Sequence, residues 1–122
     1  MRLIGVMQVA VVLGSIQAAL AAVPTGEWER DDGTVRVRIE ACGADICATN
    51  TWVKDPASAE KVGDVLVMSL KPVDPATSKG TGSDRRRNAT YSFEMKVEAD
   101  RLITKGCVLG GLLCKNVAWR RV

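Results

Sequence analysis

Apolar and polar side chains alternate along several segments of this chain, a pattern typical of β-strands that bury one face. From Thr90 to Glu98 every second residue is apolar, and the residues between them are polar or charged. The segment from Thr34 to Glu40 alternates in the same way. We therefore expect both segments to form half-buried antiparallel strands. Residues 46–53 are rich in Thr, Val and Trp, and we expect them to return from a turn near Cys42 as a hairpin partner.

Further apolar segments and tight turns complete an all-β pattern. Residues 65–70 are almost continuously apolar, which is typical of a strand covered on both faces, and a last strand is expected from about 113 to 121. Asp31-Asp32-Gly33 and Ala99-Asp100 are typical of hairpin turns. About six or seven short strands with no helical pattern after the N-terminal segment predict a small antiparallel up-and-down β-barrel; a β-sandwich is the alternative.

One connection is expected to be long. Residues 71–88 contain two prolines, two glycines and two serines, together with Arg85-Arg86-Arg87, and this composition predicts a mobile loop. The three arginines have two interpretations. They form either a solvated loop tip or a binding site for phosphate or lipid head groups.

The N-terminal residues predict export. Arg2 precedes a largely apolar stretch from Leu3 to Leu20, and Ala19-Leu20-Ala21 places small residues at the two positions that a signal peptidase reads. We therefore interpret residues 1–21 as a signal peptide cleaved after its last residue; a membrane anchor is the alternative. Its removal leaves residues 22–122 as a single small domain without a membrane span, located in the periplasm or secreted.

Four cysteines follow the predicted signal peptide. A short chain in an oxidising compartment is expected to use an even number of cysteines as disulfides. Of the three possible pairings we favour the local one, Cys42 with Cys47 and Cys107 with Cys114, because turn-forming residues separate the partners. A site with four zinc-bound thiolates is the alternative, although spacers of four and six residues are longer than those of the usual zinc knuckle.

The residue types in the chain exclude most catalytic chemistry. There is no histidine, which removes the commonest general base, the Ser–His and Cys–His pairs and histidine-ligated metals. Adjacent carboxylates such as Asp31 and Asp32 are typical of a turn rather than of an acid–base pair. The 17 basic and 14 acidic side chains are too balanced to predict a nucleic-acid partner. We expect no catalytic residue, cofactor or metal, and therefore a protein that is not an enzyme.

Several short motifs resemble a known family. They are Gly26-Glu27-Trp28, Cys42-Gly43 with Cys47, Thr90-Tyr91-Ser92, Gly106-Cys107, Leu113-Cys114 and the closing Trp119-Arg120-Arg121-Val122. Together they resemble the small exported bacterial proteins of domain-of-unknown-function family 2147, over most of the chain after the signal. Family members usually carry a Trp and a Gly, then an aspartate-proline-glycine turn, before the Thr-Tyr motif. Residues 77–88 of this chain differ from that pattern.

The resemblance implies a lipocalin-like fold. In lipocalins, the Trp of a Gly-x-Trp motif packs across the closed end of the barrel beneath an Arg from the final strand. Trp28 matches that Trp, and Arg121 is our candidate for the barrel-closing Arg. A guanidinium stacked on an indole in this way forms a cation–π contact.

Lipocalin likeness also implies an apolar ligand inside the barrel. The candidate ligand-binding side chains are inward-facing ones: Val37, Ile39, Tyr91, Phe93 and Met95. Because side chains can fill the interior of an eight-stranded barrel, we do not expect a large cavity in so short a chain. The leading hypothesis is a barrel that binds a small apolar or amphipathic molecule. The alternative is an envelope protein-interaction or inhibitor module that acts through its outer surface and residues 71–88.

Overall fold

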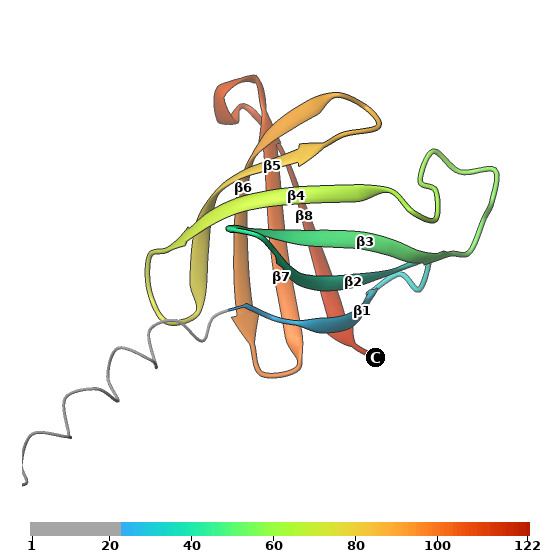
Figure 1. Ribbon diagram of the computed structural model, residues 1–122, viewed down its shortest axis with the longest axis horizontal. Coiled ribbons are helices and arrows are strands. Elements are labelled where there is room, and N and C mark those ends of the chain that lie inside the picture. The colour runs from blue at the N-terminus through green and yellow to red at the C-terminus, as the bar shows by residue number, and fades with distance from the viewer. Residues whose placement is uncertain (1–22) are drawn as a thin grey trace, which may run out of the picture.

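Strands account for almost all of the regular structure in the computed structural model, which describes residues 23–122. The signal peptide and cleavage site predicted at residues 1–21 lie outside this range. Each strand runs antiparallel to the one before it (Figure 1). In chain order the strands are β1 (Gly26–Arg30), β2 (Val35–Cys42), β3 (Asp45–Val53), β4 (Val65–Pro72), β5 (Thr77–Asp84), β6 (Ala89–Glu98), β7 (Arg101–Val108) and β8 (Leu113–Arg121).

The sheet closes on itself, because β1 pairs with β8 as well as with β2. Trp28 lies opposite Arg121 across this seam, and Arg30 lies opposite Trp119. The closure confirms the predicted up-and-down barrel and excludes a sandwich, in which two separate sheets face each other. Residues 26–121 form eight strands instead of the six or seven expected.

The prediction of a mobile loop over residues 71–88 is wrong. β5 occupies residues 77–84 and pairs with both β4 and β6. It lacks the alternation that marks a strand, because Gly80 and Gly82 carry no side chain. A Cβ atom on Gly80 would lie 1.9 Å from the carbonyl oxygen of Ser69 on β4, so the neighbouring strand approaches too closely for a side chain. Glycine is typical of loops, but here Gly80 allows β5 to lie close to β4.

The longest connection in the described range joins β3 to β4 over residues 54–64. It lies at the same end of the barrel as the β5–β6 and β7–β8 turns (Figure 1). We call this the loop end. The β7–β8 turn contains the short 3-10 helix η2 (Leu109–Gly111). Within residues 23–122, no helix has the length and apolar character needed to cross a membrane.

Both cysteine pairs form local disulfides. Cys42 and Cys47 are joined across the β2–β3 turn, and Cys107 is joined to Cys114 at the opposite position of β8. The favoured pairing is therefore confirmed, and the zinc alternative is wrong because all four sulfurs are in disulfides. Two disulfides indicate an oxidising environment outside the cytoplasm.

The core is built from inward-facing side chains of most strands. Those exposed by 2% or less are Trp28, Val35, Ile39, Met68, Met95 and Leu102. Along β6, Met95 is buried, but Phe93 and Tyr91 are only partly buried. The interior is therefore filled around Met95 and opens toward the beginning of β6, which lies at the loop end.

Candidate functional site

The side chains of Trp28 and Arg121 meet at the end of the barrel where β1 begins. The guanidinium carbon of Arg121 lies 4.3 Å from the centroid of the Trp28 ring, and Trp28 is fully buried. Trp28 donates a hydrogen bond from Nε1 to the carbonyl oxygen of Pro24, and Arg121 donates one to that of Thr25. The segment before β1 is thereby held across the barrel end. The two candidate barrel-closing residues lie together, as the family resemblance implies.

The backbone conformation of Gly26 and its closeness to Arg121 explain why this motif begins with a glycine. Its φ of +132° lies in a region that side chains disfavour. A Cβ atom at this position would also lie 2.9 Å from Nη1 of Arg121. Glycine therefore allows the backbone to pass close to the arginine that covers Trp28.

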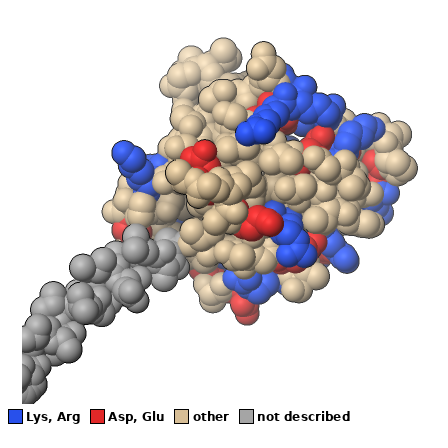
Figure 2. Space-filling model, in the orientation of Figure 1, with Lys and Arg blue, Asp and Glu red and all other residues tan. Residues whose placement is uncertain are grey.

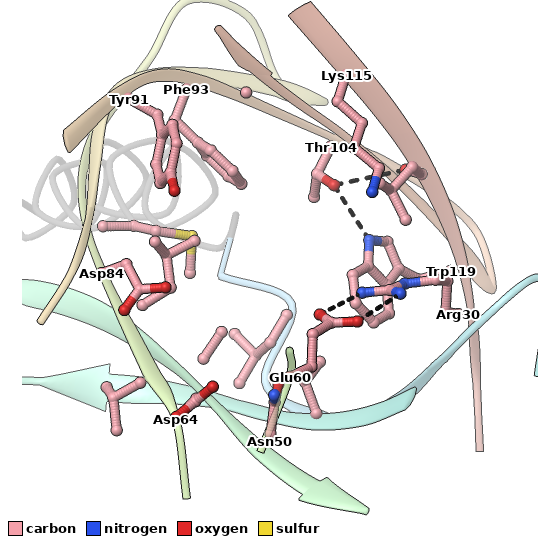
Figure 3. A pocket seen from close by; sticks show the side chains of 18 of the residues that line it. Arg30, Asn50, Glu60, Asp64, Asp84, Tyr91, Phe93, Thr104, Lys115 and Trp119 are labelled. Atoms are coloured by element: carbon pink, nitrogen blue, oxygen red, sulfur yellow. Dashed lines mark hydrogen bonds and ion pairs between the residues drawn. The ribbon is translucent and has the colours of Figure 1, made fainter. Parts of the chain in front are cut away.

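Beyond this floor the barrel contains a cavity of about 560 Å³. It is lined by all five predicted ligand-binding side chains, which are Val37, Ile39, Tyr91, Phe93 and Met95. Tyr91 and Phe93 form an aromatic wall (Figure 3). Small-molecule sites commonly occupy about 300–1,000 Å³, so this volume is of the right size for one. The expectation that the interior holds no large cavity is therefore wrong.

The cavity remains open partly because some of the residues that line it are small. Ala48 and Gly106 lie among the lining residues. A Cβ atom on Gly106 of β7 would lie 3.7 Å from Cδ1 of Phe93, and one on Gly82 of β5 would lie 3.4 Å from the same atom. The Phe93 ring thus packs over glycines on both neighbouring strands. Alternation identifies which positions face inward, but it does not show how far a large side chain reaches into the lumen.

The wall opposite Tyr91 and Phe93 is polar (Figure 3). Trp119 donates from Nε1 to Oγ1 of Thr104 over 3.1 Å, and both side chains are buried. The guanidinium carbon of Arg30, the neighbour of Trp119 across the β1–β8 seam, lies 5.4 Å from the centroid of the Trp119 ring. We call Arg30, Thr104, Lys115 and Trp119 the polar wall.

Arg30 forms a two-pronged ion pair with Glu60 of the β3–β4 loop. Nη1 and Nη2 donate to the two carboxylate oxygens over 2.8 and 2.7 Å. These hydrogen bonds raise the pKa of the guanidinium above its ordinary value, against the opposing effect of burial. The Arg30 side chain is 16% exposed and that of Glu60 is 35% exposed. Nε of Arg30 is buried and has no partner among residues 23–122.

Two arginines of the β5–β6 turn hold the β3–β4 loop against the barrel. Arg86 donates from Nε to Asp64 over 2.6 Å, and Arg87 donates from Nη1 to Asp84 over 2.6 Å. Both arginines also donate from Nη2 to the carbonyl oxygen of Ala59. The hydrogen bond from Arg86 holds the pKa of Asp64 below its ordinary value of 3.8.

These contacts change both interpretations for two of the three arginines, Arg86 and Arg87. Arg86 and Arg87 are not a merely solvated tip, because they fasten one loop to another. They are not a vacant anion site either, because Asp64 and Asp84 already occupy their guanidinium groups. The repulsion expected within a run of like charges is relieved by these two carboxylates.

The polar wall and its partner Glu60 were not predicted from the sequence. Arg30 follows Trp28 by two residues on β1, so strict alternation places it on the same inward face. That signal was available but is weak, since arginine is a rare inward residue. Glu60 has no comparable signal, because a loop of 11 residues has no periodicity from which the direction of a side chain can be predicted.

Charges on the outer surface lie close to charges of the opposite sign. Figure 2 shows basic and acidic side chains interspersed over one face of the molecule. Glu29, for example, accepts hydrogen bonds from Arg36 and Arg120, and these lower the pKa of the Glu29 carboxyl. Pairs such as these bring opposite charges together on the outer surface.

Comparison with known proteins gives a family. Residues 26–121 match the family described as "Uncharacterized protein conserved in bacteria (DUF2147)". No curated protein and no solved structure matches the chain. The family match extends from the first residue of β1 to the last residue of β8, and it therefore includes the complete barrel. On this evidence the chain belongs to the DUF2147 family of uncharacterised bacterial proteins.

Proposed function

We propose that this protein binds a small amphipathic molecule in the cavity of its barrel. The cavity itself carries the proposal, with its volume of about 560 Å³, its aromatic wall and its polar wall. A few polar groups set into a mostly apolar lining are typical of sites that bind and orient a small molecule. A ligand with an apolar body and one polar group matches this arrangement.

The proposed role is non-enzymatic and lies in the periplasm or outside the cell. The chain has no histidine, and its cysteine sulfurs are in disulfides, so the usual pairs of nucleophile and base cannot form. The predicted signal peptide and the two disulfides support the location.

A protein-interaction or inhibitor role on the outer surface is the second candidate. Residues 71–88 no longer favour it, because β5 occupies the centre of that segment. The β7–β8 turn does favour it, since Leu109, Leu112 and Leu113 are 71%, 86% and 62% exposed there. Exposed apolar side chains that lie close together are typical of contact surfaces between proteins.

Native mass spectrometry of protein purified from its own cell envelope separates the two candidates. The binding proposal predicts a co-purifying mass of lipid or metabolite size that is lost on denaturation. Protein that carries no such mass, and that also fails to take up an apolar fluorophore, would overturn the proposal and favour the surface role.

Uptake of N-phenyl-1-naphthylamine, an uncharged fluorophore, tests whether binding occurs inside the barrel. Gly106→Leu directs a new side chain into the cavity, because a Cβ atom there makes only an ordinary contact with Phe93. Lys105→Leu adds the same side chain at the neighbouring outward position, which is exposed. Gly106→Leu is expected to weaken fluorophore binding about tenfold, and Lys105→Leu to leave it unchanged. Equal effects would place the fluorophore outside the cavity.

A further inference from the structure

We propose that the ligand carries a carboxylate group, and that Arg30 binds this carboxylate in place of Glu60. This inference rests on the proposed function and names the chemical class of the ligand. Within the barrel, Glu60 acts as a tethered substitute for the ligand's own head group.

The position of Arg30 is the first step. Its side chain starts from a barrel strand, lines the cavity and lies against the ring of Trp119. A planar guanidinium presents paired N–H donors whose spacing matches the two oxygens of a carboxylate, and Glu60 shows that both donors are accessible to such a group. Trp119, which lies against the guanidinium, is itself held by its hydrogen bond to Thr104.

The origin of Glu60 is the second step. Its carboxylate reaches Arg30 from the β3–β4 loop, not from a barrel strand, and its side chain is about twice as exposed as that of Arg30. Glu60 can therefore leave Arg30 and regain full contact with water by a movement of the loop. Arg30 starts from a barrel strand and stays in the wall. Arg30 is the fixed partner of the pair, and Glu60 is the exchangeable one.

The balance of charge around the cavity is the third step. Three carboxylates and three cations line it, and each carboxylate is paired with an arginine: Glu60 with Arg30, Asp64 with Arg86, and Asp84 with Arg87. Lys115 lines the polar wall and forms no ion pair within residues 23–122. The wall that holds Arg30 thus has a second cation that is in no ion pair, although Asp32 of the β1–β2 turn lies within electrostatic reach of both cations. A cation without a direct carboxylate partner favours an anionic head group over a neutral or cationic one.

The exchange also has a consequence for the loop. Ser58, Ala59 and Glu60 line the cavity, so the β3–β4 loop covers part of it. When a ligand carboxylate replaces Glu60, the loop loses its contact inside the barrel but keeps those with Arg86 and Arg87. Binding is therefore expected to release the Glu60 side chain while the loop stays attached at Ala59 and Asp64.

Competition between decanoate and 1-decanol for N-phenyl-1-naphthylamine tests this inference, because the two competitors share a chain length and differ in the head group. In Glu60→Gln, Arg30 loses its competing carboxylate, and decanoate is expected to bind about tenfold more tightly than to the wild type, with 1-decanol unchanged. Glu94→Gln is the matched control. Glu94 pairs with Lys79 on the outer surface, and its removal is expected to change neither affinity.

Substitutions of Arg30 provide the reciprocal test. Arg30→Lys keeps the charge but loses the paired donors, and Arg30→Gln loses both. Added to Glu60→Gln, each is expected to abolish the gain for decanoate and to leave 1-decanol binding intact. Circular dichroism and urea midpoints verify that the variants are folded. If Arg30→Gln unfolds the barrel, Arg30→Lys alone decides the test.

The outcomes separate this inference from the proposed function. If folded Glu60→Gln binds decanoate no more tightly than the wild type, or strengthens 1-decanol equally, the carboxylate inference is wrong although the cavity still binds ligands. If the fluorophore does not bind wild-type protein and neither competitor binds by calorimetry, the proposed function itself fails.

Discussion

At the scale of single residues, exposure to water distinguishes the contacts between arginine and tryptophan. Arg121 lies over Trp28, which is fully buried, and Arg36 lies over Trp52, which is 39% exposed. The guanidinium carbon lies 4.3 Å from the ring centroid in the first contact and 5.2 Å in the second, and both distances are within the range of a cation–π contact. Arg121 itself is exposed, but its partner ring is fully excluded from water. Because a cation–π contact strengthens where water is excluded, the contact at the barrel floor should contribute more to stability.

Two double-mutant cycles test this difference by urea denaturation. Trp28→Leu and Arg121→Ala, made singly and together, are expected to give a coupling free energy of about 1–2 kcal/mol. Trp52→Leu and Arg36→Ala, on the outer surface, are expected to give about 0.5 kcal/mol or less. Absence of coupling between Trp28 and Arg121 would mean that Trp28 stabilises the barrel only as a large apolar side chain.

Gly80→Ala and Gly82→Ala add the same methyl group at two positions of β5 with different neighbours. At Gly80 the new carbon would lie 1.9 Å from the carbonyl oxygen of Ser69, which cannot move without disturbing the β4–β5 pairing. At Gly82 it would lie 3.4 Å from side-chain atoms of Leu66 and Phe93. We expect Gly80→Ala to lower the free energy of unfolding by about 3 kcal/mol and Gly82→Ala by about 1 kcal/mol. Similar urea midpoints for the two variants would contradict the close approach of the strands.

Much of the candidate site could be predicted residue by residue, and the remainder could not. Val37, Ile39, Tyr91, Phe93 and Met95 were identifiable because alternation along a strand decides which side chains face the interior. Glu60 was not, because its position depends on how a long loop folds back over the barrel. Ion pairs between residues 30 positions apart in the chain leave no periodic signal.

At the scale of elements, the β3–β4 loop depends on charged contacts for its position. Glu60 binds Arg30 of β1, and Asp64 binds Arg86 of the β5–β6 turn. The loop also receives hydrogen bonds at the carbonyl oxygen of Ala59. A single exposed ion pair contributes little to stability, but several that act on one loop together fix its position.

Acid is expected to loosen this loop through Asp64. The hydrogen bond from Arg86 holds the pKa of Asp64 below 3.8, so the ionised form is favoured in the folded state. A carboxyl group with a depressed pKa stabilises the fold fully above its unfolded pKa, and this contribution is lost as the pH falls through the folded pKa. The urea midpoint of wild-type protein should exceed that of Asp64→Asn at pH 7, and the difference should disappear as the pH falls below 3.8.

Asp100→Asn is the control for this titration. Asp100 lies in the exposed β6–β7 turn, and its side chain forms no ion pair within residues 23–122. We expect no difference in midpoint between this variant and the wild type at pH 7. A wild-type advantage over Asp64→Asn that persists at low pH would contradict the assigned role of the Asp64 charge.

The strands differ in how strongly the sequence specifies them. β2, β6 and β8 were predictable to within one or two residues, because a buried face imposes alternation on the sequence. β5 was not, because its glycines permit close contact with β4 and remove the apolar side chains that would have marked it. The physical requirement of close approach therefore outweighs local propensity in this strand.

At the scale of the whole molecule, the barrel has one short seam. β1 and β8 are paired over three residue pairs, in contrast to seven between β6 and β7. The seam also joins the two ends of the described chain, so no turn connects its strands. Local opening of a barrel occurs where the fewest contacts must break, and we expect this barrel to open along β1.

Hydrogen exchange measured by NMR tests where the barrel opens. The amide of Asp31, which donates to the carbonyl oxygen of Ala118, and that of Val122, which donates to Glu27, report on the seam. They are expected to exchange at least about tenfold faster than amides in the middle of the β6–β7 ladder, after correction for intrinsic rates. Equal protection at the two places would mean that the barrel opens only by global unfolding.

The two glycines beneath Phe93 bear on how barrels of this kind could diversify. Gly82 on β5 and Gly106 on β7 leave room for the Phe93 ring, which lines the cavity, whereas the polar wall comes from β1, β7 and β8. A methyl group at either glycine would lie against this ring and alter the shape of the aromatic wall without altering a charge or a hydrogen-bond donor. Capacity and chemical selectivity are thus encoded at different positions, and each can vary in small steps while the other stays constant.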